Sequence, residues 1–335
     1  EFVQAASLAL FDYLRKSKAK GFVLSLSGGA DSSTIAVLVA EMVRRGIENL
    51  GVDGFISKLG LPLTASTNDA EKSLVNQLLT TAYQGTKNSS EATFNSAKAL
   101  AESLGATFVS WSIEEEVQAY TQTIEGVLGR ALTWEQDDIS LQNIQARTRS
   151  PIIWLLANLK NALLLSTSNR SEGDVGYATM DGDTSGSISP IAGVDKDFVI
   201  HWLQWAEKNL DRPGLREVNA LTPTAELRPQ ERSQTDEKDL MPYSLLVEIE
   251  RLAIRDRRSP LEVFVALRKK NEFNEAELKE YIKKFFRLWS RNQWKRERLA
   301  PSFHLDDFNV DPKTWCRFPI LSGGFEEELN ELDKN

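Results

Sequence analysis

The stretch SLSGGADSS (residues 25–33) joins a short apolar segment to a segment with helical spacing. The apolar segment, KGFVLSLS at 20–27, is short enough to predict a buried strand. Beyond the stretch, apolar residues recur at helical spacing from Asp31 to Arg45, and Gly46 is expected to end that helix. A glycine turn at the end of a buried strand lets backbone amides approach an oxyanion. The stretch therefore predicts a loop that binds phosphate.

Neither common nucleotide-binding signature explains this loop. The lysine-containing P-loop requires GxxxxGK[ST] and the dinucleotide-binding turn requires GxGxxG, and the loop fits neither pattern. Instead, Asp31 follows the glycines at the edge where phosphate would bind. A carboxylate repels phosphate unless a cation separates them, so we expect Asp31 to bind Mg²⁺. The alternative is that Asp31 only caps the next helix and that Gly28 and Gly29 only form a turn. The loop alone leaves both interpretations open.

Outward from this loop, strand-like and helix-like segments alternate. Further strands are predicted at 52–57, 106–112 and 161–169, and further helices at 91–105 and at 141–160, the second perturbed at Pro151. This alternation predicts an α/β fold, with an open, mostly parallel sheet and helices on both faces. The segments 60–90 and 171–190 are rich in Ser, Thr, Gly and Asn and are expected to be long loops.

The pattern changes near residue 240. Three segments, 242–256, 260–270 and 274–294, have helical periodicity with no strand-like segment between them. We therefore expect an α/β domain over 1–240 and a C-terminal helical extension over 241–335 that packs on it. The extension is locally basic, because its stretch 251–300 carries 15 Lys and Arg against 7 Asp and Glu. These residues are expected to form a solvated face, with anion binding by a few of them as the alternative.

Composition limits the partners and the compartment. The net charge of −8 and the pI near 5.1 argue against nucleic acid and anionic membranes as partners. The single cysteine, Cys316, excludes a disulfide within this chain and favours a cytoplasmic location. With only two histidines, a Cys/His zinc site is disfavoured. No apolar run approaches the roughly 20 residues that span a bilayer, and no basic and apolar leader is visible.

The strand, the SGGADSS turn and the following helix together resemble the ATP-pyrophosphatase superfamily, whose motif SGGxDS this stretch matches residue for residue. The resemblance implies an adenine nucleotide alpha hydrolase-like fold. It also implies cleavage of ATP between the α and β phosphates, with the loop holding the departing pyrophosphate. That task needs no lysine for a γ phosphate.

Within this superfamily, residues 143–196 are similar to NAD synthetase. They contain, in the order found in that family, the elements QARTR, STSNRSEGD, GYAT, DGD and PIAGVDK. Farther on, PTAELRPQERSQTDEKDL (223–240) and NQWKRERLAP (292–301) resemble its later motifs, so the resemblance spans nearly the whole chain. It implies that ATP and Mg²⁺ convert nicotinic acid adenine dinucleotide (deamido-NAD) to an acyl adenylate with loss of pyrophosphate. Ammonia then gives NAD⁺ and AMP.

The resemblance also assigns roles to individual residues. The residues implied in ATP binding are Ser27, Gly28, Gly29, Asp31, Ser32, Ser33, Thr167, Lys196 and Thr224. Asp31 and Glu172 would bind Mg²⁺, and Asp31 and Lys196 would be catalytic. Arg147 and Lys295 would bind the dinucleotide. The structural alternatives are a surface position for Glu172 and a solvated helix start for Lys196.

Some neighbouring residues receive no individual role in catalysis. Tyr177, Asp181 and Asp183 lie in a segment that resembles the family's active-site cover. Arg149 is expected in a structural ion pair. The aromatic residues expected in the core or an interface, rather than against nicotinate, are Trp202, Trp205, Phe285 and Phe286.

Departures from the ammonia-using members of the family resemble its glutamine-dependent type. Met180, Asp181 and Ser187 stand where the ammonia-using members commonly have Lys, Tyr and Asp. Glutamine-dependent members carry an N-terminal nitrilase-like glutaminase domain with a Glu-Lys-Cys triad, which Cys316 alone does not supply. Ammonia is therefore expected from a domain or partner outside this chain, or from solution, and the start at Glu1 favours a missing N-terminal part. Family members are homodimers with the dinucleotide at the interface, which implies a homodimer here.

Two other functions remain as alternatives. A tRNA thiolation ligase of the same superfamily would need a basic surface and usually a cysteine pair, and the acidic pI and lone cysteine argue against it. A nucleotide-sensing subunit without turnover is the second alternative. Intact Asp31, Glu172 and Lys196 argue against that one.

Overall fold

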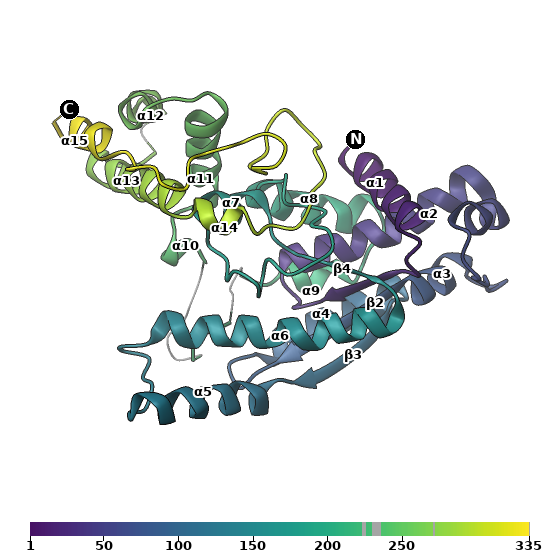
Figure 1. Ribbon diagram of the computed structural model, residues 1–335. Coiled ribbons are helices and arrows are strands. Elements are labelled where there is room, and N and C mark those ends of the chain that lie inside the picture. Colours follow the sequence, from purple (N-terminus) through teal and green to yellow (C-terminus); the bar gives the residue numbers. More distant parts are fainter. Residues whose placement is uncertain (223–225, 230–235, 271, 335) are drawn as a thin grey trace.

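The computed structural model describes residues 1–222, 226–229, 236–270 and 272–334. Its centre is a sheet of parallel strands in the order β3-β2-β1-β4 (Figure 1). The strands are β1 (Phe22–Ser25), β2 (Leu79–Gly85), β3 (Thr107–Ser112) and β4 (Leu163–Leu165). Phe22 pairs with Leu79 on one side and with Leu163 on the other, which places β1 inside the sheet. The predicted parallel α/β sheet is confirmed.

Helices make up most of the remaining described chain. Up to residue 222 they are α1 (Phe2–Ser17), α2 (Ala30–Leu59), α3 (Ala70–Leu78), α4 (Glu91–Leu104), α5 (Glu114–Leu128), α6 (Asp138–Lys160), α7 (Arg170–Val175), α8 (Lys196–Asn209) and α9 (Leu215–Asn219). Later ones are α10 (Asp236–Asp239), α11 (Tyr243–Glu250), α12 (Pro260–Leu267), α13 (Glu275–Arg291), α14 (Gln293–Arg296) and α15 (Glu326–Lys334). Within the described chain, none of the helices combines the length and the apolar character that crossing a bilayer requires.

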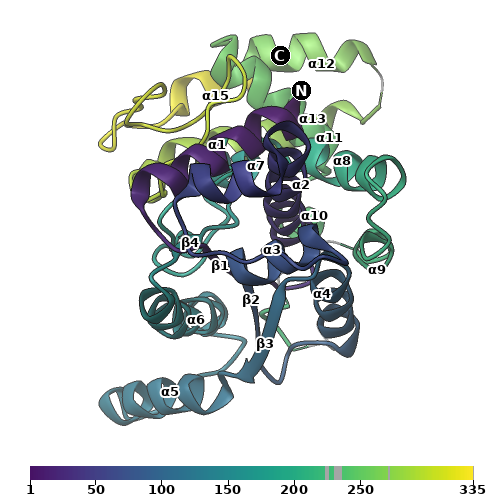
Figure 2. The ribbon, with the colours of Figure 1, turned by 90° about the vertical axis from the view of Figure 1, so that its right-hand side faces the viewer.

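Helices cover both faces of the sheet, because successive strand residues point to opposite faces. Phe22 and Leu24 belong to the large core that α2 and α4 close on one face. Val23, between them, joins a smaller cluster with Ile153 and Ala157 of α6 on the other face. Figure 2 shows α4 and α6 on opposite sides of the strands. A parallel strand that is apolar on both faces requires such double cover.

The order of the strands creates a crevice at one edge of the sheet. From β1 the chain adds β2 and then β3 in one direction, and β4 joins on the other side of β1. Parallel sheets bind ligands where the strand order reverses, outside the carboxyl ends of the strands. In this chain that position lies between the segments that follow β1 and β4. These segments carry Asp31 and Glu172.

The segment after Arg45 corrects two predictions. Gly46 does not end the helix and 52–57 is not a strand, because α2 continues to Leu59 with a kink at Gly51 (φ 69°). A Cβ on Gly46 would lie 2.2 Å from the ring of Phe55, so this glycine permits close packing. The fully buried Phe55 ring belongs to the main core. This tertiary packing outweighs the strand-like local pattern.

The predicted loop at 60–90 is also wrong, because it contains α3 and the interior strand β2. The strand reads LTTAYQG, and its threonines and glutamine lack the apolar signature of a buried strand. Two of its polar side chains form hydrogen bonds within the sheet: Thr81 Oγ1 donates to the Thr107 carbonyl at 3.0 Å, and Gln84 Nε2 donates to Ser25 Oγ at 3.1 Å. The other predicted strands contain β1, β3 and β4, and α6 runs through Pro151 as one helix.

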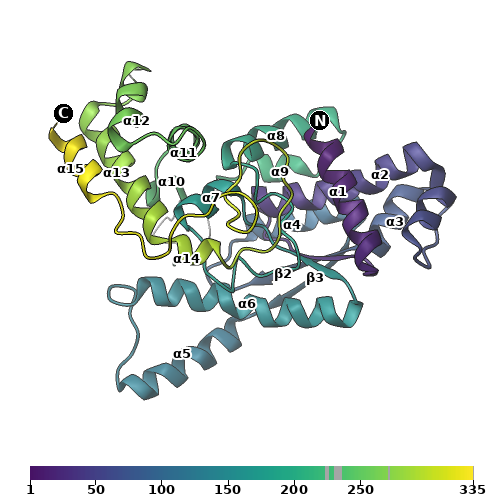
Figure 3. The ribbon, with the colours of Figure 1, turned by 45° about the horizontal axis from the view of Figure 1, so that its top comes forward.

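The C-terminal part forms the predicted helices and has its own apolar core. The three segments predicted to be helical form α11 to α14 together with a π turn (Arg251–Arg255) and a 3₁₀ turn (Arg268–Lys270). Their core includes Phe264 and Phe285, and Val175 of α7 joins it. Figure 3 shows this group of helices beside the sheet, with α7 between them. The domain boundary near residue 240 stays a prediction.

Candidate active site

A cleft of about 740 Å³ opens at the carboxyl end of the sheet. Its walls come from the loop after β1, from α6, from the segment after β4, and from α13 and α14. The predicted ATP-binding residues in its lining are Ser27, Gly29, Asp31, Ser32, Thr167 and Lys196. Glu172 and Lys295 line it as well. The cleft therefore brings together residues from distant parts of the chain.

The loop after β1 is held by short-range contacts. The Ser27 amide donates to Ser32 Oγ at 3.2 Å, and the two hydroxyls lie 3.1 Å apart. Gly28 has φ +83°, and a Cβ there would lie 2.2 Å from the Thr93 carbonyl oxygen, so only glycine fits. Gly28 and Ser33 are buried beneath the loop and do not line the cleft.

Asp31 does not cap α2. Gly29 is the N-cap residue, and among the residues that the structure describes no side chain caps the start of this helix. The Asp31 carboxylate instead pairs with the Lys196 ammonium, and its Oδ1 accepts from Asn169 Nδ2 at 3.0 Å. The α2 amides therefore stay available at the cleft, with Asp31 beside them.

Glu172 and Asp31 converge on one buried positive charge. Lys196 Nζ is paired with Asp31 and lies 3.6 Å from Glu172 Oε1, and the Lys196 side chain is only 4% exposed. Lys196 is thus not a solvated helix start. Two carboxylates with room for phosphate oxygens are the donor set that Mg²⁺ prefers. No group of three or more acid, His or Cys side chains in the described residues is placed to hold a metal ion.

Asn169 is a site residue that the sequence prediction omitted. Its Oδ1 accepts from the Glu172 amide at 2.9 Å and caps α7, while its Nδ2 donates to Asp31 at 3.0 Å. One buried amide side chain therefore links both predicted metal ligands. The spacing N-x-x-E at 169–172 is a helix-capping signal that marks this residue.

The remaining predicted residues lie as follows. Thr167 follows β4 and lines the cleft. Thr224 lies outside the described residues. Lys295 Nζ donates to the carbonyls of Gly176 and Ala178, at 2.8 and 2.9 Å, and so ties α14 to the segment after α7. Burial lowers the pKa of the Lys295 ammonium.

The two arginines of the QARTR motif take different positions on α6. Arg147 is exposed, donates to the Met180 carbonyl at 3.0 Å, and does not line the cleft. Arg149 lines the cleft and donates to the Gln84 carbonyl at 3.2 Å. The geometry thus presents Arg149 to the cleft of this chain, although the resemblance favours Arg147.

The segment over the cleft is fixed at several points. Tyr177 donates to Asp239 at 2.9 Å, and Asp181 pairs with Arg298 at 2.7 Å. The Ser187 amide donates to the carbonyl of Leu164 in β4 at 2.7 Å, and Ser187 Oγ accepts from the Leu164 amide at 3.2 Å. Among the four aromatic residues expected in the core or an interface, Trp202, Phe285 and Phe286 are buried, and Trp205 is 47% exposed.

Comparison with known proteins gives consistent matches. A family model described as NAD synthase matches residues 2–298. The glutamine-dependent NAD(+) synthetase of Oryza sativa subsp. indica is 33% identical, over 100% of this chain and 50% of that protein. The protein of the same name in Arabidopsis thaliana is 34% identical, over 90% of this chain and 45% of that protein. A crystal structure of a glutamine-dependent NAD(+) synthetase from Cytophaga hutchinsonii has a TM-score of 0.90 and 57% identity, over 99% of this chain and 55% of that chain.

Proposed function

We propose a function from the premise that this chain belongs to the NAD synthase family, whose model matches residues 2–298. The proposed reaction converts the nicotinate carboxylate of deamido-NAD to the amide of NAD⁺. ATP transfers its adenylyl group to that carboxylate and pyrophosphate leaves. Ammonia then attacks the acyl carbon and AMP leaves. The observation that carries the proposal is the convergence of Asp31 and Glu172 on Lys196 at the edge of the sheet.

The residues around this point suit a triphosphate. The loop after β1 offers backbone amides and the hydroxyls of Ser27 and Ser32, which bind phosphate without adding charge. Lys196 supplies a positive charge for the phosphates, and its burial strengthens that interaction. Because attack on the α phosphorus expels pyrophosphate, stabilising the leaving group lowers the barrier to adenylation.

Asp31 and Glu172 are the residues that would hold Mg²⁺. Both carboxylates lie beside the Lys196 ammonium, so binding of the ion between them would require Lys196 to turn toward the phosphates. When bound, the ion neutralises charge on the phosphate oxygens. Asn169 orients the Asp31 carboxylate and holds the backbone of Glu172, since its side chain bonds to both.

Ammonia is proposed to come from glutamine through a domain or partner outside these 335 residues. The chain spans about half the length of the curated relatives it matches, and those relatives are named glutamine-dependent. Free ammonium would then replace glutamine in the reaction of this chain alone. If glutamine supported turnover of the purified chain, the nitrogen source would lie within it.

A homodimer is proposed from the exposed apolar face of α5 and α6. Helix α5 has no buried residue, and its Val127 and Leu128 are 78% and 52% exposed. On α6, Leu159 is 78% exposed. Exposed apolar side chains of this size, present on both helices, favour burial against a second subunit. Sedimentation of Val127→Asp should show a monomer, while Leu321→Asp, at a leucine of the C-terminal segment that is 96% exposed, should stay dimeric.

Two more expectations are kept as proposals. The division into an α/β domain over 1–240 and an extension over 241–335 is supported by two apolar clusters that fall mainly on the two sides, with Phe303 in the first and Val175 in the second. A cytoplasmic location is supported by the single cysteine. Limited proteolysis tests the first proposal, and localisation of the tagged protein tests the second.

The decisive experiment is a product assay. The purified chain is incubated with ATP, Mg²⁺, deamido-NAD and ammonium, and AMP, pyrophosphate and NAD⁺ are measured. Equal amounts of the three products are expected. AMP formed only when tRNA replaces the dinucleotide would instead support a thiolation ligase. Binding of ATP without any AMP would support a nucleotide-sensing subunit.

A further inference from the structure

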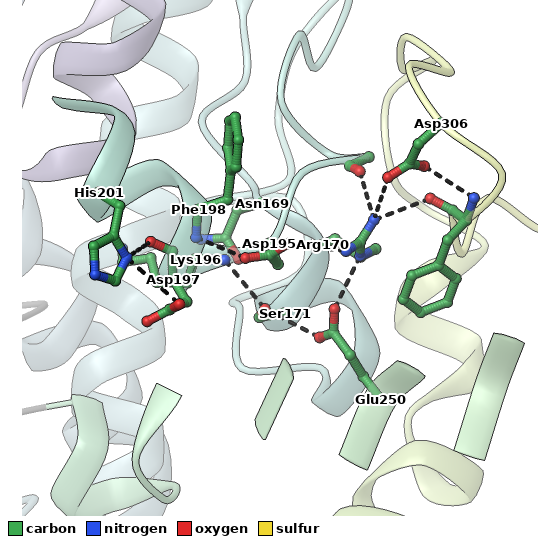
Figure 4. Close-up of polar contacts among 12 residues, drawn as sticks. Asn169, Arg170, Ser171, Asp195, Lys196, Asp197, Phe198, His201, Glu250 and Asp306 are labelled. Atoms are coloured by element: carbon green, nitrogen blue, oxygen red, sulfur yellow. Dashed lines mark hydrogen bonds and ion pairs between the residues drawn. The ribbon is translucent and has the colours of Figure 1, made fainter. Parts of the chain in front are cut away.

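Arg170 is a buried guanidinium that joins separate parts of the chain (Figure 4). Its side chain is 6% exposed, and its Nε donates to Glu250 of α11 at 2.9 Å. Its other donors reach Asp195 at 3.0 Å, the carbonyls of Gly193 and Phe308 at 2.9 and 3.0 Å, and Asp306 at 3.2 Å. The contacts belong to the start of α8, to α11 and to the segment after α14.

Glu250 is the contribution of the C-terminal extension to this network. Its carboxylate is fully buried, and its Oε1 accepts from Arg170 while its Oε2 accepts from Ser171 Oγ at 3.1 Å. The Ser171 hydroxyl in turn accepts from the Lys196 amide at 3.2 Å. Burial raises the pKa of Glu250, as does the nearby carboxyl of Asp174, and the charge of Arg170 opposes this rise.

The network fixes the two helix starts that carry site residues. Arg170 and Ser171 begin α7, which presents Glu172 to the cleft. Asp195 caps α8 by accepting from the Phe198 amide at 2.7 Å, and Lys196 follows it directly. Neither Arg170 nor Glu250 lines the cleft. These two residues therefore act on the site only through the backbone they hold.

We propose that Glu250 and Arg170 are positioning residues for the nucleotide site, and that the C-terminal extension is thereby part of that site. This inference rests on the proposed function for the identity of the nucleotide. Asp31 lies on α2, whose backbone the network does not hold, although its carboxylate pairs with Lys196. Loss of the Glu250 charge displaces Glu172 and Lys196 together, so it weakens Mg²⁺ and ATP more than deamido-NAD.

The loss of one buried charge explains why the small change Glu250→Gln is expected to weaken nucleotide binding strongly. A buried ion pair that loses one partner leaves an uncompensated charge, which the surrounding structure moves to hydrate. In Glu250→Gln, Arg170 keeps its positive charge but loses one of its negative partners. The new side-chain amide has a single oxygen, whereas Arg170 and Ser171 each donate to one carboxylate oxygen of Glu250. The first turns of α7 and α8, which this network holds, are then free to shift. Asp195 and Asp306 retain part of the compensation, so the fold survives.

The test uses the full chain and a nucleotide that cannot be cleaved. Binding of the α,β-methylene analogue of ATP with Mg²⁺ is measured by calorimetry for wild type and Glu250→Gln. We expect the Kd to rise at least about fivefold, and the KM for ATP to rise with it. The KM for deamido-NAD should change less than about twofold. The Mg²⁺ concentration for half-maximal rate should rise as well.

Glu41→Gln is the matched control. Glu41 is also fully buried and bonded to arginines, with Arg212 Nη2 at 2.7 Å and Arg44 Nε at 3.0 Å. Its network does not reach α7 or α8, so its variant should lose stability and keep its affinity for the analogue. If Glu250→Gln lowers the melting temperature as Glu41→Gln does and binds the analogue like wild type, Glu250 is structural and the inference is overturned.

Ser171→Ala covers the case in which Glu250→Gln does not fold. It removes the hydroxyl between Glu250 and the Lys196 amide and leaves the Arg170 pair in place. A Kd raised about two- to threefold is expected, since both hydrogen bonds of this hydroxyl are lost while the ion pair of Arg170 and Glu250 stays. An unchanged Kd in this variant counts against the inference. A wild type that binds the analogue but makes no NAD⁺ would overturn the proposed reaction and leave the positioning role intact.

Discussion

The two carboxylates that meet at Lys196 are held in opposite ways. Asp31 stands in the first turn of α2, directly after a loop whose contacts come from neighbours such as Ser27 and Ser32, a few residues away. Glu172 stands on a six-residue helix that depends on Arg170 and its distant partners. A turn carries its geometry in its own sequence, while so short a helix needs support from outside. The position of Asp31 can therefore be predicted from the local sequence, whereas the support of Glu172 cannot.

The largest expected effect on turnover comes from replacing Asp31, the carboxylate that local contacts position. Asp31→Asn removes the carboxylate that faces the phosphates and keeps the side-chain shape. We expect turnover to fall at least about 100-fold, because an amide binds Mg²⁺ poorly and leaves phosphate charge uncompensated. Formation of NAD⁺ and AMP at saturating Mg²⁺ measures it. Circular dichroism and the melting temperature show that the variant is folded.

Glu172→Gln is the partner experiment for the other half. If both carboxylates bind the ion, this variant loses turnover to a similar degree. Wild-type rates for Asp31→Asn at saturating Mg²⁺ would remove Asp31 from the metal site. Retained activity in Glu172→Gln alone would reduce the site to a single carboxylate.

Two adjacent glycines test the turn itself. Gly28→Ala forces a side chain into φ +83° and places its Cβ 2.2 Å from the Thr93 carbonyl oxygen. We expect the free energy of unfolding to fall by about 2–4 kcal/mol, as strain and a backbone clash add. Gly29→Ala is the control, because its Cβ meets only Ser27 Oγ, at 3.4 Å, and its φ is −85°. Equal destabilisation in urea melts would show that the turn does not depend on Gly28.

The same division explains what the sequence predicted. The turn within 25–33 and the helix 91–105 have signals within a few residues, glycines and caps, and the conformation of both was predicted correctly. Phosphate binding by the turn stays a prediction. The strand β2 was missed because its burial comes from β1 and β3 on either side, not from its own composition. The segment 52–57 was misassigned because the packing of Phe55 decided its conformation.

The site divides along the same line. Motifs identified the residues that line the cleft, Asp31, Thr167 and Lys196 among them. The buried partners that hold them, Arg170 and Glu250, carry no local pattern, because their pairing exists only after the chain has folded. Asn169 combines both situations. Its role as the cap of α7 can be predicted from the nearby sequence, whereas its bond to Asp31 joins residues far apart in the chain.

Asn169 is therefore the residue that sharpens the comparison. Asn169→Ala removes the α7 cap and the bond to Asp31, and we expect kcat/KM to fall about tenfold, as misplaced ligands raise the barrier. The control is Asn274→Ala, which removes an equivalent cap, bonded to the Glu277 amide at 2.9 Å, from α13. Both variants should lose about 1 kcal/mol of stability. Steady-state rates and melts of the pair separate capping from ligand placement, and equal rates would reduce Asn169 to a cap.

The smallest effect is expected at Arg147, where resemblance and geometry differ. Arg147 is exposed and held by the Met180 carbonyl, whereas Arg149 lines the cleft. An exposed guanidinium gains little from a charged ligand, because water screens it. We expect Arg147→Ala to raise the KM for deamido-NAD about threefold and to change the KM for ATP less. A larger rise for Arg149→Ala, with no change for Arg147→Ala, would transfer dinucleotide binding to Arg149. A strong effect of Arg147→Ala that disappears in the monomeric Val127→Asp background would place Arg147 against a ligand shared between two subunits.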